Sequence, residues 1–91
     1  MADVRALAAA YGLRIERADL GDWGSVQLIA EYDPAGPTIR IDERAVRDVD
    51  RAIAHELYHH REAIGEVPRI ADRRAREAAA DAYADALTNA P

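Results

Sequence analysis

Apolar and polar residues alternate with two different periods along this chain. Three stretches carry apolar residues at helical spacing, and three shorter stretches alternate from one residue to the next, as strands do. The elements predicted in chain order are a helix at 3–11, strands at 13–17, 25–32 and 38–42, and helices at 46–64 and 69–89. Because the strands and most of the helices are segregated, the pattern predicts an α+β fold with a small, mainly antiparallel sheet.

Turn-forming residues support these boundaries. Gly12 is expected to end the first helix, and Pro68 must end the next long helix because proline cannot continue one. The sequence at 33–37 contains two prolines and a glycine, which predicts an antiparallel return between the second and third strands. Asp42 is a candidate N-cap for the helix that follows the third strand. Trp23, the only tryptophan, is expected to cover the rim of the core.

The apolar positions inside these elements define the expected core. On the strands they share one face, and on the helices they form stripes. The expected core residues are Val4, Leu7, Ala8, Tyr11, Val26, Leu28, Ala30, Tyr32, Ile39, Ile41, Val46, Val49, Ile53, Leu57, Ile64, Ile70, Ala80, Ala84 and Leu87. A chain of 91 residues makes one small domain, so this core is modest.

Composition narrows the chemistry that the domain can support. The chain has no cysteine, which excludes disulfides and thiolate zinc sites and leaves histidine and carboxylates as metal ligands. The lack of cysteine also fits an intracellular protein, and we expect a cytoplasmic one without a signal peptide or a transmembrane helix. A net charge of −5 disfavours the phosphate backbone of nucleic acids as the main partner.

The most specific chemical pattern is His-Glu-x-x-His at 55–59, inside the predicted helix 46–64. Residues four apart lie on one helix face, so His55 and His59 can bind the same metal ion. Glu56 is rotated by about 100° from His55, which directs it toward a water at the metal rather than to the metal itself. Two nitrogen ligands beside a carboxylate base are typical of a zinc hydrolase.

A third ligand is expected from the last helix. We expect that helix to fold back antiparallel to the histidine helix. The histidine pair lies about 12 Å before the turn, so a residue about 13.5 Å after the turn lies at the same level. That residue is Glu77, and Asp81 follows one turn later, where it can accept a hydrogen bond from His55. Inward-facing carboxylates are unfavourable unless they are paired or bind a metal. The acidic residues that lie too near the turn, too far along or on the wrong helix face are Glu66, Asp72, Asp85 and Glu62.

These residues together resemble a known family. His55-Glu56-x-x-His59, followed on the next helix by Glu77-x-x-x-Asp81, is similar to the gluzincin metallopeptidases, and in detail to the small minigluzincin and ImmA/IrrE-like members. The strand ahead of the histidine helix is also similar. The resemblance covers most of the chain from residue 7 onward and implies a minimal zincin-like domain.

The resemblance also implies roles for these residues. The implied roles are zinc binding by His55, His59 and Glu77, general-base catalysis by Glu56, and support of a ligand by Asp81. A protein or peptide substrate is implied to lie along the free edge of the sheet, here the strand at 26–31. Metzincins match less well, because the glycine and third histidine that they require would fall on Glu62 and Gly65.

Other residues near the motif have competing interpretations. His60 points roughly 100° away from His59 and is expected at the surface. Tyr58 and Tyr83 are expected to pack, although these three residues are also candidates for stabilising an oxyanion or contacting substrate. The arginines at 69–76 are expected to form a solvated helix face, with a partner site as the alternative.

Three functions therefore stay open from the sequence. The first is a zinc-dependent metallopeptidase with a narrow protein or peptide substrate, such as a regulator. The second is a metal-binding but non-proteolytic interaction or regulatory module on the same scaffold, and the third is a metal-free scaffold with an accidental motif. Manganese, iron or cobalt can also occupy a site of two histidines and a glutamate, although zinc is favoured by ligand type. Larger gluzincins supply an oxyanion donor from a further domain after the glutamate helix, and without that donor we expect low or partner-dependent activity.

Overall fold

A computed structural model of the chain describes residues 3–18, 22–23, 26–27, 30–43 and 48–88. Within these residues it contains three helices and a mixed three-stranded sheet, which confirms the predicted α+β class. The elements are α1 (Val4–Ala10), β1 (Arg14–Arg17), β2 (Asp22–Trp23), β3 (Val26–Gln27), β4 (Ala30–Asp33), β5 (Thr38–Ile41), α2 (Val49–Ala63) and α3 (Arg73–Thr88). None of the described helices has both the length and the apolar character needed to cross a bilayer.

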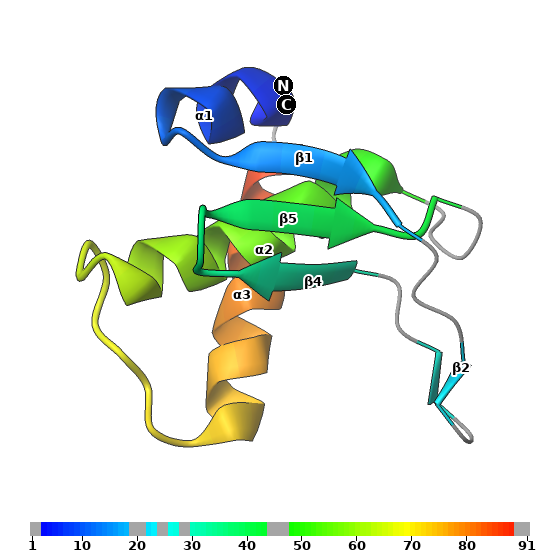
Figure 1. Cartoon of the computed structure of the whole chain (residues 1–91). Coiled ribbons are helices and arrows are strands. Elements are labelled where there is room, and N and C mark those ends of the chain that lie inside the picture. The colour runs from blue at the N-terminus through cyan, green and yellow to red at the C-terminus, as the bar shows by residue number, and fades with distance from the viewer. Residues whose placement is uncertain (1–2, 19–21, 24–25, 28–29, 44–47, 89–91) are drawn as a thin grey trace.

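The sheet has the strand order β1–β5–β4 (Figure 1). β4 and β5 are antiparallel across the predicted turn, where the Asp33 side chain accepts a hydrogen bond from the Ala35 N–H and Gly36 has a positive φ. β1 pairs with β5 in parallel, with Ile15 opposite Ile39, so the expectation of a mainly antiparallel sheet is wrong for one of its two pairings. No tight turn connects β1 to its neighbour in the sheet, and local sequence therefore does not set its direction.

The predicted strand at 25–32 belongs to two separate ladders. Its described part near the start is β3, which pairs with β2, whereas β4 lies in the main sheet. Ala30 and Tyr32 pack against the core, as predicted. The predictions for the side chains of Trp23, Val26 and Leu28 lie outside the described part of the chain.

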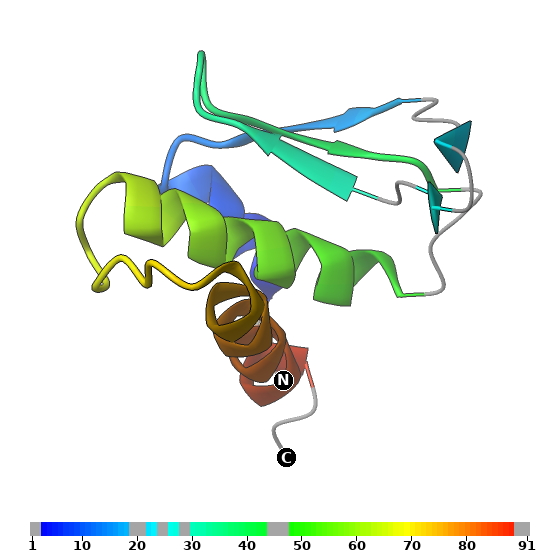
Figure 2. The same ribbon diagram turned by 90° about the horizontal axis from the view of Figure 1, so that it is seen from below.

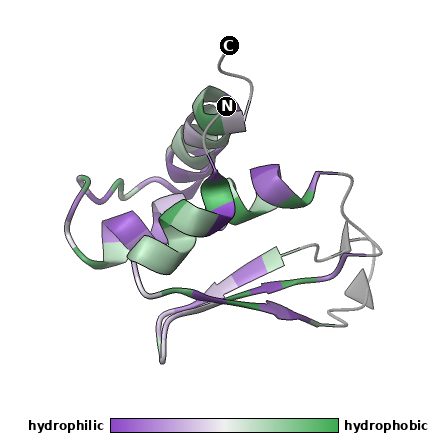
Figure 3. Cartoon of the chain, turned by 90° about the horizontal axis from the view of Figure 1, so that it is seen from above, coloured by the Kyte–Doolittle hydropathy of each residue, from purple (hydrophilic) through white to green (hydrophobic). Residues whose placement is uncertain are grey.

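The helices form two further layers behind the sheet. α2 lies across one face of the sheet, and α3 lies on the far side of α2, as Figures 1 and 2 show. α2 and α3 each carry both hydrophilic and apolar residues (Figure 3), as expected for helices with one buried side. The buried core consists of Val4, Ala8, Leu13, Ile39, Ile41, Ile53, Ala54, Leu57 and Ala84. The central helix α2 is therefore packed on the sheet, α1 and α3 at once, which holds its motif residues in place.

α2 begins later than predicted and has a different cap. Its N-cap is Asp48, whose side chain accepts a hydrogen bond from the Arg51 N–H at 3.0 Å. The prediction of Asp42 as the cap is wrong, because Asp42 is buried directly after β5 and the chain needs further residues to reach the helix. The predicted start at Val46 lies outside the described residues. The helix ends before Gly65, whose positive φ is the usual left-handed stop.

α3 also differs from its prediction in its start and its direction. It begins at Arg73 rather than at residue 69, with the Asp72 carboxylate accepting from the Ala75 N–H at 2.8 Å. Ile70 consequently lies in the connection rather than on the helix. The expected antiparallel pairing is wrong, because α3 crosses α2 steeply (Figures 1 and 2). The connection is longer than the predicted turn at 65–68, so α3 does not have to return along α2.

The packing of α2 gives a direct test of this fold. Leu57 is fully buried, and we expect Leu57→Ala to lower the free energy of unfolding by about 2–5 kcal/mol. Ile64, which was predicted as core, is 53% exposed at the end of the same helix, so Ile64→Ala serves as the matched control with a small effect. Urea unfolding followed by circular dichroism measures both. Equal effects of the two substitutions would contradict the described core.

Candidate metal centre

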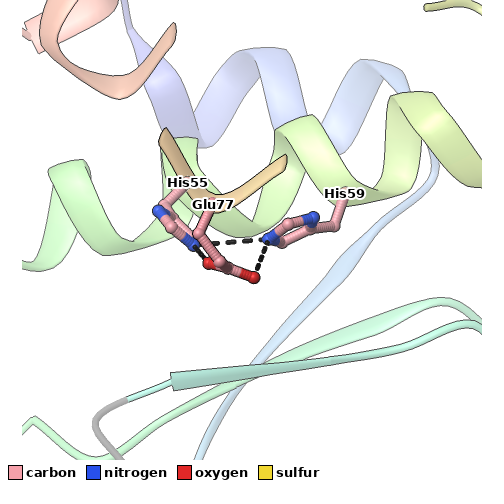
Figure 4. Close-up of side chains that lie close together, drawn as sticks. All are labelled: His55, His59 and Glu77. Carbon is pink, nitrogen blue, oxygen red and sulfur yellow. Dashed lines mark hydrogen bonds and ion pairs between the residues drawn. The ribbon is translucent and has the colours of Figure 1, made fainter. Parts of the chain in front are cut away.

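Two helices bring three potential metal ligands together. α2 presents His55 and His59 one turn apart, and α3 crosses α2 so that Glu77 points between them (Figure 4). Glu77 Oε2 lies 2.8 Å from His55 Nε2, Glu77 Oε1 lies 3.3 Å from His59 Nε2, and the two Nε2 atoms are 3.3 Å apart. All three ligand atoms are within 4.8 Å of one another, so this group could hold a metal ion.

The second nitrogen of each imidazole faces a carboxylate. His55 Nδ1 lies 2.8 Å from Asp81 Oδ1, and His59 Nδ1 lies 3.0 Å from Glu62 Oε1. An ionised carboxylate only accepts hydrogen bonds, so each Nδ1 is assigned the proton and donates it. Each Nε2 then presents a lone pair toward the other Nε2 and toward the Glu77 carboxylate. Three lone-pair donors that converge repel one another unless a cation lies among them, and the donor set therefore fits a metal ion.

The hydrogen bond from His55 to Asp81 is the one predicted from the sequence. Glu62 was missed, because the sequence argument showed only that it points away from a metal between the histidines. It is not a member of the ligand group, but it accepts the hydrogen bond of His59 from three residues along the same helix. The i,i+3 spacing was the available signal. The side chain of Glu62 is only 6% exposed, so this carboxylate is a buried support for His59.

Asp81 and its neighbour Asp85 allow a controlled test of this support. Asp81→Ala removes the acceptor that holds His55 Nδ1, and we expect zinc affinity to fall about 10- to 100-fold. Asp85 lies one turn further along α3 and pairs with Arg51 at 3.0 Å, so Asp85→Ala is the matched control with unchanged affinity. Competition with a chromogenic chelator measures both affinities. Equal losses in the two variants would show that surface charge, rather than support of His55, is responsible.

Glu56 lies beside this group without belonging to it. Its side chain is buried, and burial raises the pKa of Glu56, while His55 and His59 oppose that rise. Glu56 lines a cavity of about 400 Å³ together with His59 and Glu77. Glu56 therefore shares a cavity with two members of the ligand group, and its role as a base stays a prediction.

The cavity lies beside the metal-ligand group and draws on several elements. β4 and its turn, α2, the connection after α2, and α3 all contribute to it. The lining residues are Tyr32, Pro34, Glu56, His59, Glu62, Ala63, Arg69, Arg76 and Glu77. Tyr32 is a lining residue that the sequence interpretation assigned only to the core. Its place here results from the packing of β4 on α2, which no local pattern reveals.

His60 and the two tyrosines were candidates for contacts with substrate. The prediction that His60 lies at the surface is wrong, because the rings of Tyr11, directly after α1, and of Tyr32 in β4 cover it. Tyr32 Oη lies 2.7 Å from His60 Nδ1, and burial lowers the pKa of His60. Tyr58 and Tyr83 pack on each other with ring centroids 5.7 Å apart. Neither they nor His60 line the cavity, so Tyr32 is the one tyrosine of the described residues that reaches it.

Comparison with known proteins adds no relative to this description. No family model matches the chain, and no match is found among curated proteins or solved structures. The class of the protein is therefore defined by its fold and its site. It is a small α+β domain in which two histidines and a glutamate form a group that could hold a metal ion.

Proposed function

We propose that this protein is a minimal zinc metallopeptidase of the gluzincin type, related to the minigluzincin and ImmA/IrrE-like enzymes, with a narrow protein or peptide substrate. The observation that carries the proposal is the convergence of three lone-pair donors from His55, His59 and Glu77. Two imidazoles and one carboxylate form the donor set of several zinc peptidases, which leave one coordination position open. The adjacent carboxylate of Glu56 supports a hydrolytic role over a purely structural one.

Each residue has a defined role in this proposal. His55, His59 and Glu77 would hold the ion, and Asp81 and Glu62 orient the two imidazoles through their Nδ1 hydrogen bonds. Bound zinc supplies Lewis acidity, which polarises a carbonyl group and lowers the pKa of water. Glu56 accepts the proton of the attacking water on its carboxylate and returns it to the leaving amine. In the metal-free protein, burial raises the pKa of Glu56.

The substrate is proposed to bind along the edge of the main sheet. β4 is an edge strand that packs on α2, and an extended peptide can add to such an edge through main-chain hydrogen bonds. Only part of the predicted edge at 26–31 belongs to β4, because residues 26–27 pair with β2. We therefore assign the peptide-binding edge to Ala30–Asp33.

A proteomic cleavage screen tests the proposed function. Zinc-loaded wild-type protein and Glu56→Gln are incubated with separate aliquots of one cell extract, and new peptide termini are counted by mass spectrometry. Termini that appear only with the wild-type protein support a peptidase. Zinc-loaded protein that produces no such termini would contradict the proposal and favour the non-proteolytic interaction module.

A further inference from the structure

Two arginines of the cavity have no partner. Arg69 lies in the connection between α2 and α3, and Arg76 lies on α3 directly before Glu77. Within the described chain neither guanidinium forms an ion pair or a hydrogen bond, and the buried Arg76 Nε has no acceptor. Five other arginines have carboxylate partners, namely Arg5, Arg17, Arg40, Arg51 and Arg61. Arg69 is exposed, as predicted, although it lies outside the helix, whereas Arg76 is only partly exposed.

A buried hydrogen-bond donor without an acceptor is unfavourable, so we expect the Arg76 guanidinium to bind an acceptor from outside the chain. The carboxylates in the cavity do not provide one. Glu77 faces the two histidine Nε2 atoms, and Glu62 accepts from His59 through Oε1. Three carboxylates and two guanidinium groups line the cavity. With a divalent metal ion bound, the cavity therefore carries one net positive charge.

We propose that Arg69 and Arg76 bind a carboxylate of the substrate on one side of the scissile bond. This inference rests on the proposed peptidase function and adds the class of substrate. A guanidinium donates two parallel N–H groups to a carboxylate, a geometry that lysine or a neutral amide does not reproduce. The cavity, at about 400 Å³, has room for an acidic side chain or a chain terminus. The carboxylate belongs either to an Asp or Glu side chain or to the C-terminus of the peptide.

Binding to an inactive protein tests the inference without turnover. The protein is zinc-loaded Glu56→Gln, and the probes are three N-acetylated oligoalanine peptides. One carries a Glu and a C-terminal amide, one carries a Gln and a C-terminal amide, and one carries no acidic side chain but a free C-terminal carboxylate. Calorimetric titration should show that at least one carboxylate peptide binds about tenfold or more tightly than the Gln peptide. Preference for the Glu peptide indicates an endopeptidase site, and preference for the free terminus indicates a carboxypeptidase site.

Variants at three arginines assign the preference to the cavity. Arg69→Gln and Arg76→Gln, each in the Glu56→Gln background, should remove most of the difference between carboxylate and amide peptides. Arg74 is exposed on α3 and does not line the cavity, so Arg74→Gln is the matched control that keeps the preference. Arg69 lies outside the helices, so its variant keeps the test valid if Arg76→Gln unfolds. Equal binding of all three peptides, no binding of any of them, or a preference that survives both cavity variants would overturn the inference.

The two proposals fail in different ways. If wild-type protein cleaves substrates in a Glu56-dependent manner without preference for carboxylates, the peptidase stands and the carboxylate site is wrong. If a carboxylate peptide binds through Arg69 and Arg76 but no cleavage occurs in the proteomic screen, the carboxylate site stands and the peptidase is wrong.

Discussion

His59→Ala is expected to abolish stoichiometric zinc binding and the thermal stabilisation that zinc provides. The substitution removes one of the three candidate ligands that the described residues bring together, and it also leaves the buried Glu62 carboxylate without the Nδ1 donor that it accepts from. In the wild-type protein, free zinc at about a hundred times Kd should stabilise the fold by about 2.7 kcal/mol. In a domain of this size that corresponds to a rise in Tm of about 10 °C or more. Elemental analysis after gel filtration and melting with and without zinc measure the two effects.

His60→Ala is the matched control for this prediction. His60 is the neighbouring histidine; it is buried and contacts Tyr32, but it is not part of the ligand group. Its variant is expected to melt at a lower temperature and still to bind one zinc ion, which separates loss of metal from loss of packing. Wild-type protein without stoichiometric zinc, or His59→Ala protein that retains it, would contradict the metal site.

The histidine pair was predictable because it depends on one helix alone. Spacing of four residues places both imidazoles on one face wherever the helix packs. Glu77 was found from a premise that proved wrong, since α3 crosses α2 instead of running antiparallel to it. Helices that cross touch near one place, and the fully buried Ala80 and Ala84 mark that place on α3. Glu77 lies one turn before these two alanines. The small residues at the helix crossing were therefore a better argument for Glu77 as the third ligand than its distance from the turn.

Apart from the local hydrogen bond between His59 and Glu62 and the helix cap at Asp48, the features that the sequence did not reveal depend on long-range packing. The parallel pairing of β1 with β5 joins segments separated by the whole β2–β4 region. The contact between Tyr32 and His60 links residues far apart in the chain, and it explains both the burial of His60 and the position of Tyr32 in the cavity. Helical and strand periodicity describe which face is apolar, but they do not specify which element covers it.

Substitution of the proposed base, Glu56, is expected to have a large effect on the rate of hydrolysis. Glu56→Gln is expected to lower the rate of hydrolysis about 10²- to 10⁴-fold on a substrate found in the cleavage screen, with zinc content unchanged. Glutamine has nearly the same size but cannot accept the proton of the attacking water. The zinc content should persist because Glu56 is outside the ligand group. Initial rates of the purified, zinc-loaded proteins and elemental analysis of the same samples provide the measurement.

Stability data show whether such a loss of rate is chemical. Burial raises the pKa of Glu56, so folding of the metal-free protein disfavours its ionised form. A neutral glutamine should therefore leave the free energy of unfolding at neutral pH unchanged or higher, and an inactive variant cannot be explained by unfolding. Glu66, an exposed residue that pairs with Tyr11 and Arg61 away from the cavity, provides the control Glu66→Gln with wild-type rate. A Glu56→Gln protein that is folded, zinc-loaded and as active as wild type would exclude Glu56 as the base, whereas a folded, inactive variant would assign the proton transfer to this carboxylate.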